Sequence, residues 1–260
     1  MRTVKLRGVE IGAGAPKVVV PIVGRTREAI LAKADELAAL RPDMAEWRAD
    51  YCDDRWDEPA LTETLRALRG ALGDMPLIFT FRTAPQGGEK PLAPEEYTSL
   101  NIAAARSGCV DAVDFELAAG EDWARRGFDA VHAAGVAVIG SSHDFAETPP
   151  KDELIARFRR MQELGADILK IAVMPRSRAD VLTLLAAAEE TTRLWADRPV
   201  AAISMSPLGI ASRLCGEAFG SALTFGAAGE TSAPGQLPVG QLKTVTAIVH
   251  DALKNQKADA

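Results

Sequence analysis

Short apolar runs rich in β-forming residues alternate along this chain with longer stretches of helical period, and this alternation constrains the fold most. Eight runs predict strands, over residues 17–23, 44–50, 76–82, 111–117, 136–143, 167–173, 200–206 and 221–227. Amphipathic stretches predict helices, among them residues 26–40, 94–108, 151–165, 177–195 and 239–253. Strands that alternate with helices form βαβ units and a parallel sheet. Eight such units favour a closed barrel, so the expected fold class is α/β, a (β/α)8 TIM barrel.

The chain of 260 residues has the ordinary size of one such barrel, and residues 1–260 are therefore predicted to form a single domain. Ahead of the first strand, residues 1–16 contain two short extended pieces around Gly12 and Gly14. They predict a β-hairpin that covers one end of the barrel. The last segment, 254–260, is polar and predicts a frayed tail.

Charge and composition exclude several classes of function. The formal net charge is -6 and no basic patch with interleaved aromatic residues is present, so nucleic acid is not expected as a partner. No apolar run reaches the roughly 18 residues that span a bilayer, and the first residues lack the apolar core of a signal peptide. Cys52, Cys109 and Cys215 form no CxxC pair, so we expect no metal site and a reducing, cytoplasmic location.

Polar residues inside the predicted strands gather toward the carboxyl end of each strand. Both faces of every strand are buried in a parallel barrel, so such residues are informative. Active sites of these barrels form at that end, from several strands together. The residues concerned are Glu46, Arg48, Arg82, Asp114, Glu116, His143, Lys170, Ser204 and Ser206. Their clustering predicts an active site at the C-terminal rim of the barrel.

Several of these residues also have a purely structural interpretation. Glu46 and Arg48 share one strand face and could form an ion pair with no part in chemistry. Arg82 could lie at the surface, in the loop RTAPQGGEK. Asp114 and Glu116 share a strand face without an obvious partner, which favours support of the site over direct catalysis.

Lys170 stands in the middle of the apolar run GADILKIAVMP, where burial of an ammonium group costs several kcal/mol. Its neighbours Leu169 and Ile171 point to the opposite face and leave Lys170 on the barrel interior. The amine is therefore ion-paired, or reaches solvent, or loses its proton and does chemistry. Burial and nearby cations would lower the pKa of the amine from about 10.4, and an unprotonated amine condenses with a carbonyl compound to an iminium ion.

His143 ends its strand in a small-residue context that leaves room for a ligand, whereas His132 and His250 lie in helical patterns. A histidine that titrates near neutrality can remove the proton that an iminium acidifies. Arginines at the rim would hold a carboxylate or phosphate through paired hydrogen bonds. The pattern therefore predicts a Schiff-base barrel enzyme for an anionic carbonyl compound, and it leaves aldol cleavage and elimination of water open.

Read in order, five segments resemble those of type I 3-dehydroquinate dehydratases. They are EWRAD, FTFRTAPQGGE, SSHDF, LKIAVMP and SMSPLGIASRLCGEAFGSALTFGAAGETSAPGQLPV, and the resemblance covers about residues 17–250. It implies a barrel, usually a homodimer, that dehydrates 3-dehydroquinate to 3-dehydroshikimate by syn elimination through a lysine imine in the shikimate pathway. It implies no metal and no organic cofactor, and it implies the small-molecule substrate and a second copy of the chain as partners, with no nucleic acid and no membrane.

The resemblance also implies roles for individual residues. Lys170 would form the imine, and His143 would act as general acid and base. Arg213 would grip the substrate carboxylate, which the sequence pattern alone does not indicate. The substrate-binding residues would be Glu46, Arg48, Arg82, Arg213, Ser232 and Gln236. The walls of the site and its supporting residues would be Gln86, Asp114, Glu116, Met205 and Phe225.

A few positions depart from the family pattern. Gln86 stands where many members have a glutamate that could support His143, although an amide still offers hydrogen bonds. Ile203 stands in place of a methionine, and Pro207 with Leu208 in place of a Lys-Thr pair near the anion end of the site. These positions lie at the edge of the site, so we expect them to affect rate and affinity more than reaction type.

Two other functions stay open. A class I aldolase or transaldolase shares the barrel and the lysine, and the segments MSPLG and FGAAGET lie where such enzymes bind phosphate. The arginine-rich rim and the segment SAPGQ favour a carboxylate instead. A non-catalytic paralogue that binds the metabolite is kept open by Gln86, whereas Lys170 and His143 argue against it.

Overall fold

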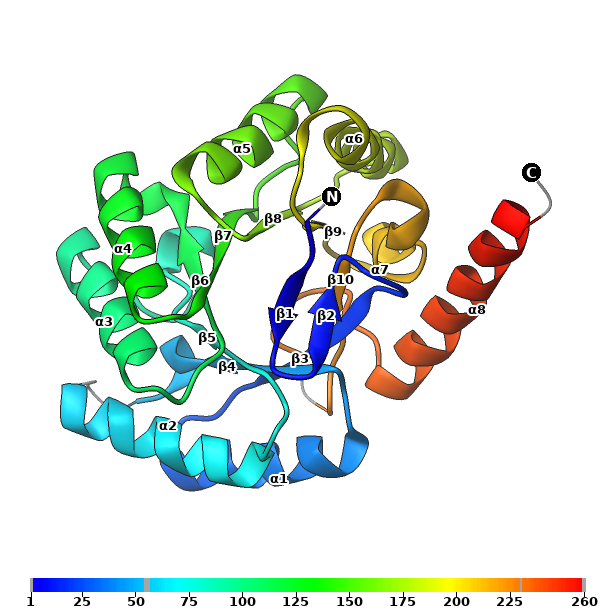
Figure 1. The fold of residues 1–260 in the computed structure, drawn as a ribbon. Helices are drawn as coiled ribbons and strands as arrows, with labels where there is room; N and C mark the ends of the chain where they lie inside the picture. Colours follow the sequence, from blue (N-terminus) through cyan, green and yellow to red (C-terminus); the bar gives the residue numbers. More distant parts are fainter. Residues whose placement is uncertain (1, 54–56, 230, 259–260) are drawn as a thin grey trace.

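The computed structural model describes residues 2–53, 57–229 and 231–258, and it shows a parallel eight-stranded sheet rolled into a barrel (Figure 1). A bridge between Val200 and Ser221 joins the two edges of the sheet. The barrel strands are β3 (Lys17–Ile22), β4 (Met44–Arg48), β5 (Leu77–Thr80), β6 (Ala112–Glu116), β7 (Ala137–Asp144), β8 (Ile168–Val173), β9 (Val200–Ser204) and β10 (Leu223–Phe225). The predicted α/β fold, a (β/α)8 TIM barrel, is confirmed.

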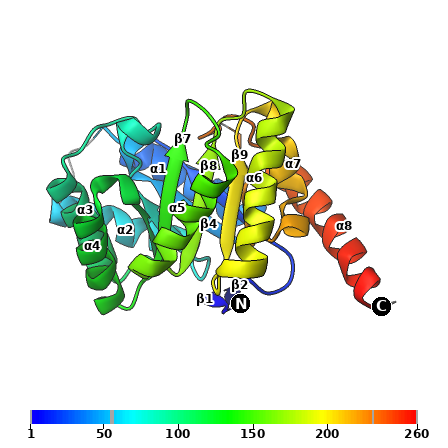
Figure 2. The same cartoon turned by 90° about the horizontal axis from the view of Figure 1, so that it is seen from above.

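Helices surround the strands on the outside of the barrel (Figures 1 and 2). They are α1 (Arg27–Leu40), α2 (Glu58–Leu72), α3 (Pro94–Arg106), α4 (Glu121–Ala133), α5 (Lys151–Leu164), α6 (Arg178–Glu190), α7 (Ile210–Leu214) and α8 (Val239–Ala258). Among the residues described, no helix is long and apolar enough to cross a membrane.

The last helix and the last strand of the barrel differ in length from what the sequence pattern predicts. Helix α8 continues to Ala258, past the predicted end at residue 253, because lysine, glutamine and alanine are good helix formers. Residues 254–258 of the predicted polar tail are therefore helical, and residues 259 and 260 lie outside the described part. Strand β10 is only three residues long, since its glycine- and alanine-rich surroundings favour strand structure weakly.

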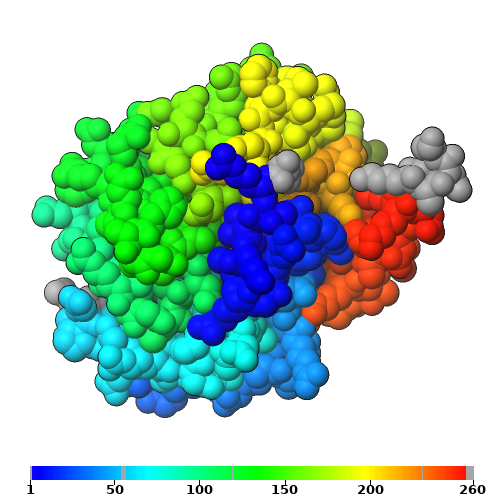
Figure 3. All heavy atoms as spheres, in the orientation of Figure 1, coloured from blue at the N-terminus to red at the C-terminus, as the bar shows by residue number. Residues whose placement is uncertain are grey.

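An antiparallel hairpin of β1 (Val4–Leu6) and β2 (Val9–Ile11) closes the amino-terminal end of the barrel (Figures 1 and 3), as predicted. Leu6 and Ile11 are buried and pack with the lowest apolar side chains of the barrel interior. Arg7 adds an ion pair to Asp111, whose side chain lies 2.8 Å away. A ligand therefore has to enter from the opposite end, where the strands have their carboxyl termini.

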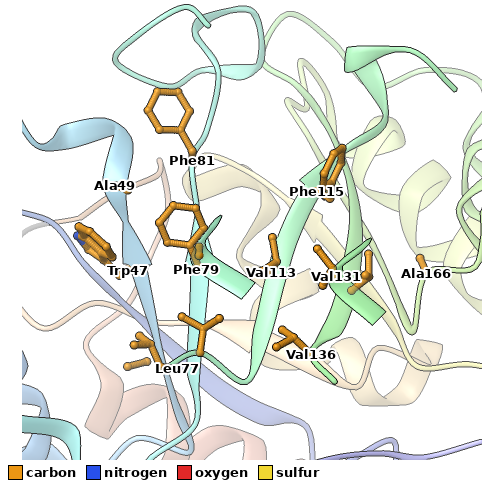
Figure 4. Close-up of a cluster of buried hydrophobic side chains, with 14 of the residues drawn as sticks. Trp47, Ala49, Leu77, Phe79, Phe81, Val113, Phe115, Val131, Val136 and Ala166 are labelled. Atoms are coloured by element: carbon orange, nitrogen blue, oxygen red, sulfur yellow. The ribbon is translucent and has the colours of Figure 1, made fainter. Parts of the chain in front are cut away.

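The larger apolar core lies between the strands and the helices, because alternate strand residues point outward. Figure 4 shows Trp47, Phe79 and Phe115 in this layer, and all three are fully buried. The rings of Trp47 and Phe79 meet edge to face, with their centroids 5.6 Å apart. Burial of a large apolar side chain contributes about 1.5–3 kcal/mol. This outer core stabilises the barrel, so the barrel interior can contain polar residues.

The barrel interior is layered, because alternate strands contribute side chains at the same height. In the lowest such layer, β4, β6, β8 and β10 contribute the buried apolar residues Met44, Ala112, Ile168 and Leu223. Two residues further along the same strands stand Glu46, Asp114, Lys170 and Phe225. The polar residues thus begin one layer above the closed end.

Three carboxylates tie the starts of neighbouring strands together. Each directly precedes a strand and accepts a hydrogen bond from a backbone N–H near the start of the preceding strand. The pairs are Asp43 with Val18 (2.7 Å), Asp111 with Leu77 (2.8 Å) and Asp167 with Val138 (2.8 Å). Buried N–H groups need such partners, so the acids stabilise the closed end of the barrel.

Asp167 also contacts His132 of α4, with 2.8 Å between Oδ2 and Nε2, and this pair predicts a pH-dependent stability. The hydrogen bond to Asp167 raises the pKa of His132. Burial alone would raise the pKa of Asp167, but hydrogen bonds from His132 and Val138 lower it. The histidine contribution is complete below its ordinary pKa of about 6.5 and is lost as the pH rises through the raised value. The aspartate contribution is lost as the pH falls through the lowered value.

We therefore expect His132→Gln to lower the free energy of unfolding more at about pH 5.5 than at about pH 8.5. The loss at the lower pH should be about 0.5 kcal/mol, the scale of a half-exposed ion pair. Urea unfolding of both proteins at both pH values measures the difference. An equal loss at the two pH values would show that the charge on His132 contributes nothing.

Candidate active site

Lys170 is one of four side chains from alternate strands that form one layer of the barrel interior. Its Nζ lies 2.8 Å from Oδ2 of Asp114 and 3.5 Å from Oε1 of Glu46, and 4.4 Å from the centre of the Phe225 ring. The nearest charged groups are therefore carboxylates, not the cations expected from the sequence. Carboxylates and an aromatic face stabilise a positive charge on the nitrogen, which ammonium and iminium forms both carry.

Arg82 follows β5 and is buried beneath the rim, so its interpretation as a surface residue is wrong. Its guanidinium donates to Asp114 (2.9 Å), Glu116 (2.8 Å) and Ser141 (3.1 Å). The two acids thus share a partner that the sequence did not reveal. Burial alone would lower the pKa of Arg82, but the two carboxylates raise it above its ordinary value. Burial opposes ionisation of Asp114 as well, yet Arg82 and Lys170 hold its pKa well below the ordinary range.

Arg48 pairs with Asp50, so the alternative interpretation of an ion pair between Glu46 and Arg48 is wrong. Nε and Nη2 of Arg48 each donate to one oxygen of Asp50 at 2.8 Å. Glu46 instead accepts a hydrogen bond from Thr80 at 2.9 Å. The sequence pattern did not indicate Asp50, and its place two residues after the arginine in EWRAD is the signal that points to it.

His143, near the end of β7, is oriented by Gln86 from the loop after β5. Oε1 of Gln86 accepts a hydrogen bond from the backbone N–H of His143 at 2.8 Å and lies 3.0 Å from Nδ1. The backbone donor requires the amide oxygen at this place, and an oxygen can only accept, so Nδ1 carries the proton. Nε2 then has a free lone pair. Burial, with the charges of Arg82 and Lys170, holds the pKa of His143 well below its ordinary value, so the imidazole is neutral.

Arg213, in the short helix α7, is a buried cation without a carboxylate partner among the described residues. It is 2% exposed. Its guanidinium donates only to the backbone oxygens of Phe225 (3.2 Å) and Pro234 (3.0 Å), and Nε has no partner within the described chain. Burial lowers its pKa to about 10. An unpaired buried guanidinium that faces a pocket is suited to a carboxylate ligand.

The segment between β10 and α8 carries Ser232 and Gln236, which form hydrogen bonds with each other. Oε1 of Gln236 accepts from the backbone N–H of Ser232 at 2.9 Å, and its Nε2 donates to the Ser232 hydroxyl at 3.1 Å. Gly235 lies in the left-handed region with φ of 79°, and a Cβ atom there would stand 2.3 Å from the carbonyl oxygen of Ser206. Only glycine therefore allows the segment to lie this close to the end of β9.

A pocket at the C-terminal end of the barrel brings most of the predicted site residues together. The predicted residues that line it are Glu46, Arg48, Arg82, Gln86, His143, Lys170, Met205, Arg213, Phe225, Ser232 and Gln236. Asp114 and Glu116 do not line it and lie behind Arg82. The lining residues that the sequence did not indicate are Gly87, Phe145, Ala172 and Ala233. The ring of Phe145 packs over Gly87, where an added Cβ atom would stand 2.2 Å from Cε2 of the ring, and the place of Phe145 in SSHDF is the signal for it.

The fold and the site together define a (β/α)8 barrel enzyme whose buried amine and imidazole face one pocket. Comparison with known proteins agrees with this class. The family model for type I 3-dehydroquinase matches residues 18–252. A 3-dehydroquinate dehydratase from Salmonella agona is 47% identical over 252 residues, which cover 97% of this chain and 100% of that protein.

Solved structures give the same result. A type I 3-dehydroquinate dehydratase from Clostridium difficile with covalently modified comenic acid has a TM-score of 0.94 at 45% identity, covering 96% of this chain and 99% of that one. A 3-dehydroquinate dehydratase from Geobacillus kaustophilus has a TM-score of 0.91 at 38% identity, covering 96% and 97%. The chain belongs to the type I 3-dehydroquinase family and is a hydro-lyase with the dehydratase activity of that family. The alternative of an aldolase or transaldolase is not supported.

Proposed function

We propose that Lys170 forms an imine with the ketone of 3-dehydroquinate and that His143 moves the protons of the dehydration. One observation supports this most: Lys170 and His143 line a single pocket, together with an arginine, Arg213, that lacks a carboxylate partner among the described residues. The pocket therefore offers a nucleophile, a base and an anion site to one small molecule.

The reaction balances with these groups alone. Nζ of Lys170 adds to the ketone carbon, and loss of water leaves an iminium ion. Nε2 of His143 removes a proton from the adjacent carbon, and the electron pair forms an enamine. The enamine expels the hydroxyl group one carbon further along, which leaves as water with the proton that His143 returns. Water then hydrolyses the iminium, releasing 3-dehydroshikimate and the free amine, so one water is lost in total.

The surrounding residues suit the parts of the substrate that do not react. Arg213 is proposed to hold the carboxylate. Hydroxyl groups of the substrate would be held by Glu46, Arg48, Arg82, Ser232 and Gln236, with Met205 and Phe225 against the ring. Asp114, held ionised by Arg82, is proposed to neutralise the positive charge that the nitrogen of Lys170 carries before and after imine formation.

Borohydride reduction in the presence of 3-dehydroquinate tests this proposal. Reduction of the imine fixes the ligand to the amine, and we expect mass mapping of peptides to find one adduct, on the peptide that contains Lys170. The product enone should appear by its ultraviolet absorbance when borohydride is omitted. Product without an adduct would refute the lysine assignment, and binding without product would identify a non-catalytic paralogue.

We also propose that the protein is a cytoplasmic homodimer. The family to which the chain belongs is usually dimeric, and this supports the proposal; Leu182 of α6 and Ile248 of α8, which are 65% and 63% exposed, are apolar side chains that a second copy would cover. Cys109 and Cys215 are free thiols, as a reducing compartment preserves them. Sedimentation equilibrium measures the oligomeric state, and a single monomeric species at micromolar concentration would refute the homodimer.

A further inference from the structure

Asp50 is a buried carboxylate that no step of the proposed chemistry uses. It lies in the turn Ala49–Tyr51 after β4, is 0% exposed and does not line the pocket. A buried charge of this kind is retained only where several donors compensate its loss of water. Its contacts therefore indicate what it does.

The first contact of Asp50 is with Arg48. The two form a bidentate pair, with Nε donating to Oδ1 and Nη2 to Oδ2, both at 2.8 Å. This geometry fixes the plane of the guanidinium and occupies its inner edge. Nη1 remains, 3.5 Å from the carbonyl oxygen of Ser232 at the mouth of the pocket. Asp50 therefore decides where the free edge of Arg48 points.

The second contact of Asp50 is with the loop that carries Gln86. Oδ1 accepts from the backbone N–H of Arg82 and Oδ2 from that of Glu89, both at 3.2 Å. One carboxylate thus holds both ends of the segment 82–89. Within that segment the N–H groups of Gln86 and Gly88 bond to the carbonyl oxygen of Thr83, which closes the loop on itself.

The loop held in this way presents Gln86 to the catalytic imidazole. Oε1 of Gln86 is the acceptor for both the backbone N–H and Nδ1 of His143. Displacement of the loop would therefore change the tautomer and the orientation of the ring. Arg48 ends strand β4 and Gln86 lies in the loop after β5, and Asp50 contacts both the guanidinium of Arg48 and that loop.

We propose that Asp50 is a positioning residue that acts on both halves of the site: it orients Arg48 toward the substrate, and it braces the loop through which Gln86 orients His143. This inference rests on the roles proposed above for Arg48 and His143. Asp50 would thus link substrate binding, through Arg48, to proton transfer, through His143.

Asp50→Asn tests the inference, because an amide keeps the size of the carboxylate but has only one accepting oxygen. Whichever way the amide turns, its NH2 group faces two of the four donors. We expect KM to rise about tenfold through Arg48 and kcat to fall about tenfold through His143, the scale for lost hydrogen bonds to charged groups. The matched control is Asp53→Asn, three residues on, whose side chain is 59% exposed and pairs with Arg25. It should leave both constants within about twofold.

Double-mutant cycles separate positioning from a general loss of structure. The rise in KM should vanish when Asp50→Asn is made in an Arg48→Met background, and the fall in kcat should vanish in a Gln86→Ala background. A rise in KM that persists in the Arg48→Met background would refute the proposed action on Arg48. A fall in kcat that persists in the Gln86→Ala background would refute the proposed action on His143. Both results together would overturn the whole proposal. If Asp50→Asn does not fold, Asp50→Ser, which keeps an acceptor and leaves room for water, is measured in the same cycles.

Borohydride trapping on the same proteins keeps the two proposals distinguishable. Asp50→Asn should still form the adduct on the peptide that contains Lys170, because Asp50 does not contact the amine. Absence of the adduct from the unmodified protein would refute the proposed role of Lys170 and say nothing about Asp50. Absence from Asp50→Asn alone would overturn the inference, since Asp50 would then act on the amine.

Discussion

Lys170→Met should reduce dehydratase turnover by at least about 10⁴-fold, the scale of losing a covalent nucleophile. Methionine has nearly the length of lysine, so the pocket keeps its shape while the amine is lost. The other groups of the site remain in place, because Asp114 keeps its hydrogen bonds from Arg82 and Ser141. Turnover is measured from the ultraviolet absorbance of the product, and the adduct after borohydride should disappear with it.

The same substitution removes a buried cation, so stability has to be measured beside activity. Leaving Asp114 and Glu46 without Lys170 costs about 3–5 kcal/mol, as does breaking a buried ion pair elsewhere. We expect a lower midpoint of thermal unfolding but a folded protein at low temperature. Lys170→Arg keeps the positive charge without a primary amine, and it should be folded and inactive. Lys151→Met, on the surface of α5, is the matched control and should keep full activity. A Lys170→Met protein at the native rate would refute the imine.

His143→Ala should lower kcat by about 10²–10⁴-fold, the usual contribution of a positioned general acid and base. That range corresponds to about 3–5 kcal/mol of transition-state stabilisation. Lys170 is unaffected, so borohydride should still trap an adduct when the incubation is long. The pairing of a slow rate with a trapped adduct separates a proton-transfer role from a role in imine formation alone.

His132→Ala is the matched control for this substitution. His132 lies in α4 and contacts Asp167 at the start of β8, at the closed end of the barrel. Its loss should leave kcat and KM unchanged. A loss below about tenfold in His143→Ala would show that another group takes the proton.

Strand and helix positions were predictable because both follow from local periodicity. The eight apolar runs correspond to the strands from Lys17–Ile22 to Leu223–Phe225, with ends that differ by a few residues. Strand β4 ends at Arg48, earlier than predicted, because the chain turns at Ala49–Tyr51, where Asp50 pairs with the arginine. Such an ending depends on contacts with other strands, and the local pattern does not contain them.

Alternation along a strand also identified which residues face the barrel interior. Lys170 was assigned to the interior because Leu169 and Ile171 occupy the other face, and the structure agrees. Its partners were not predictable, since Asp114 and Glu46 stand on strands far away in sequence and meet Lys170 only when the sheet closes.

By itself, the sequence determined the barrel, the end at which polar residues gather, and the resemblance that points to the family. These depend on the spacing of residues along the chain, which the sequence alone contains. Only the tertiary structure decided which charges pair: Arg82 with two acids, Arg48 with Asp50, and Arg213 with no carboxylate among the described residues. The reason is physical, because the strength of an ion pair depends on distance and burial, and both are set by packing between strands.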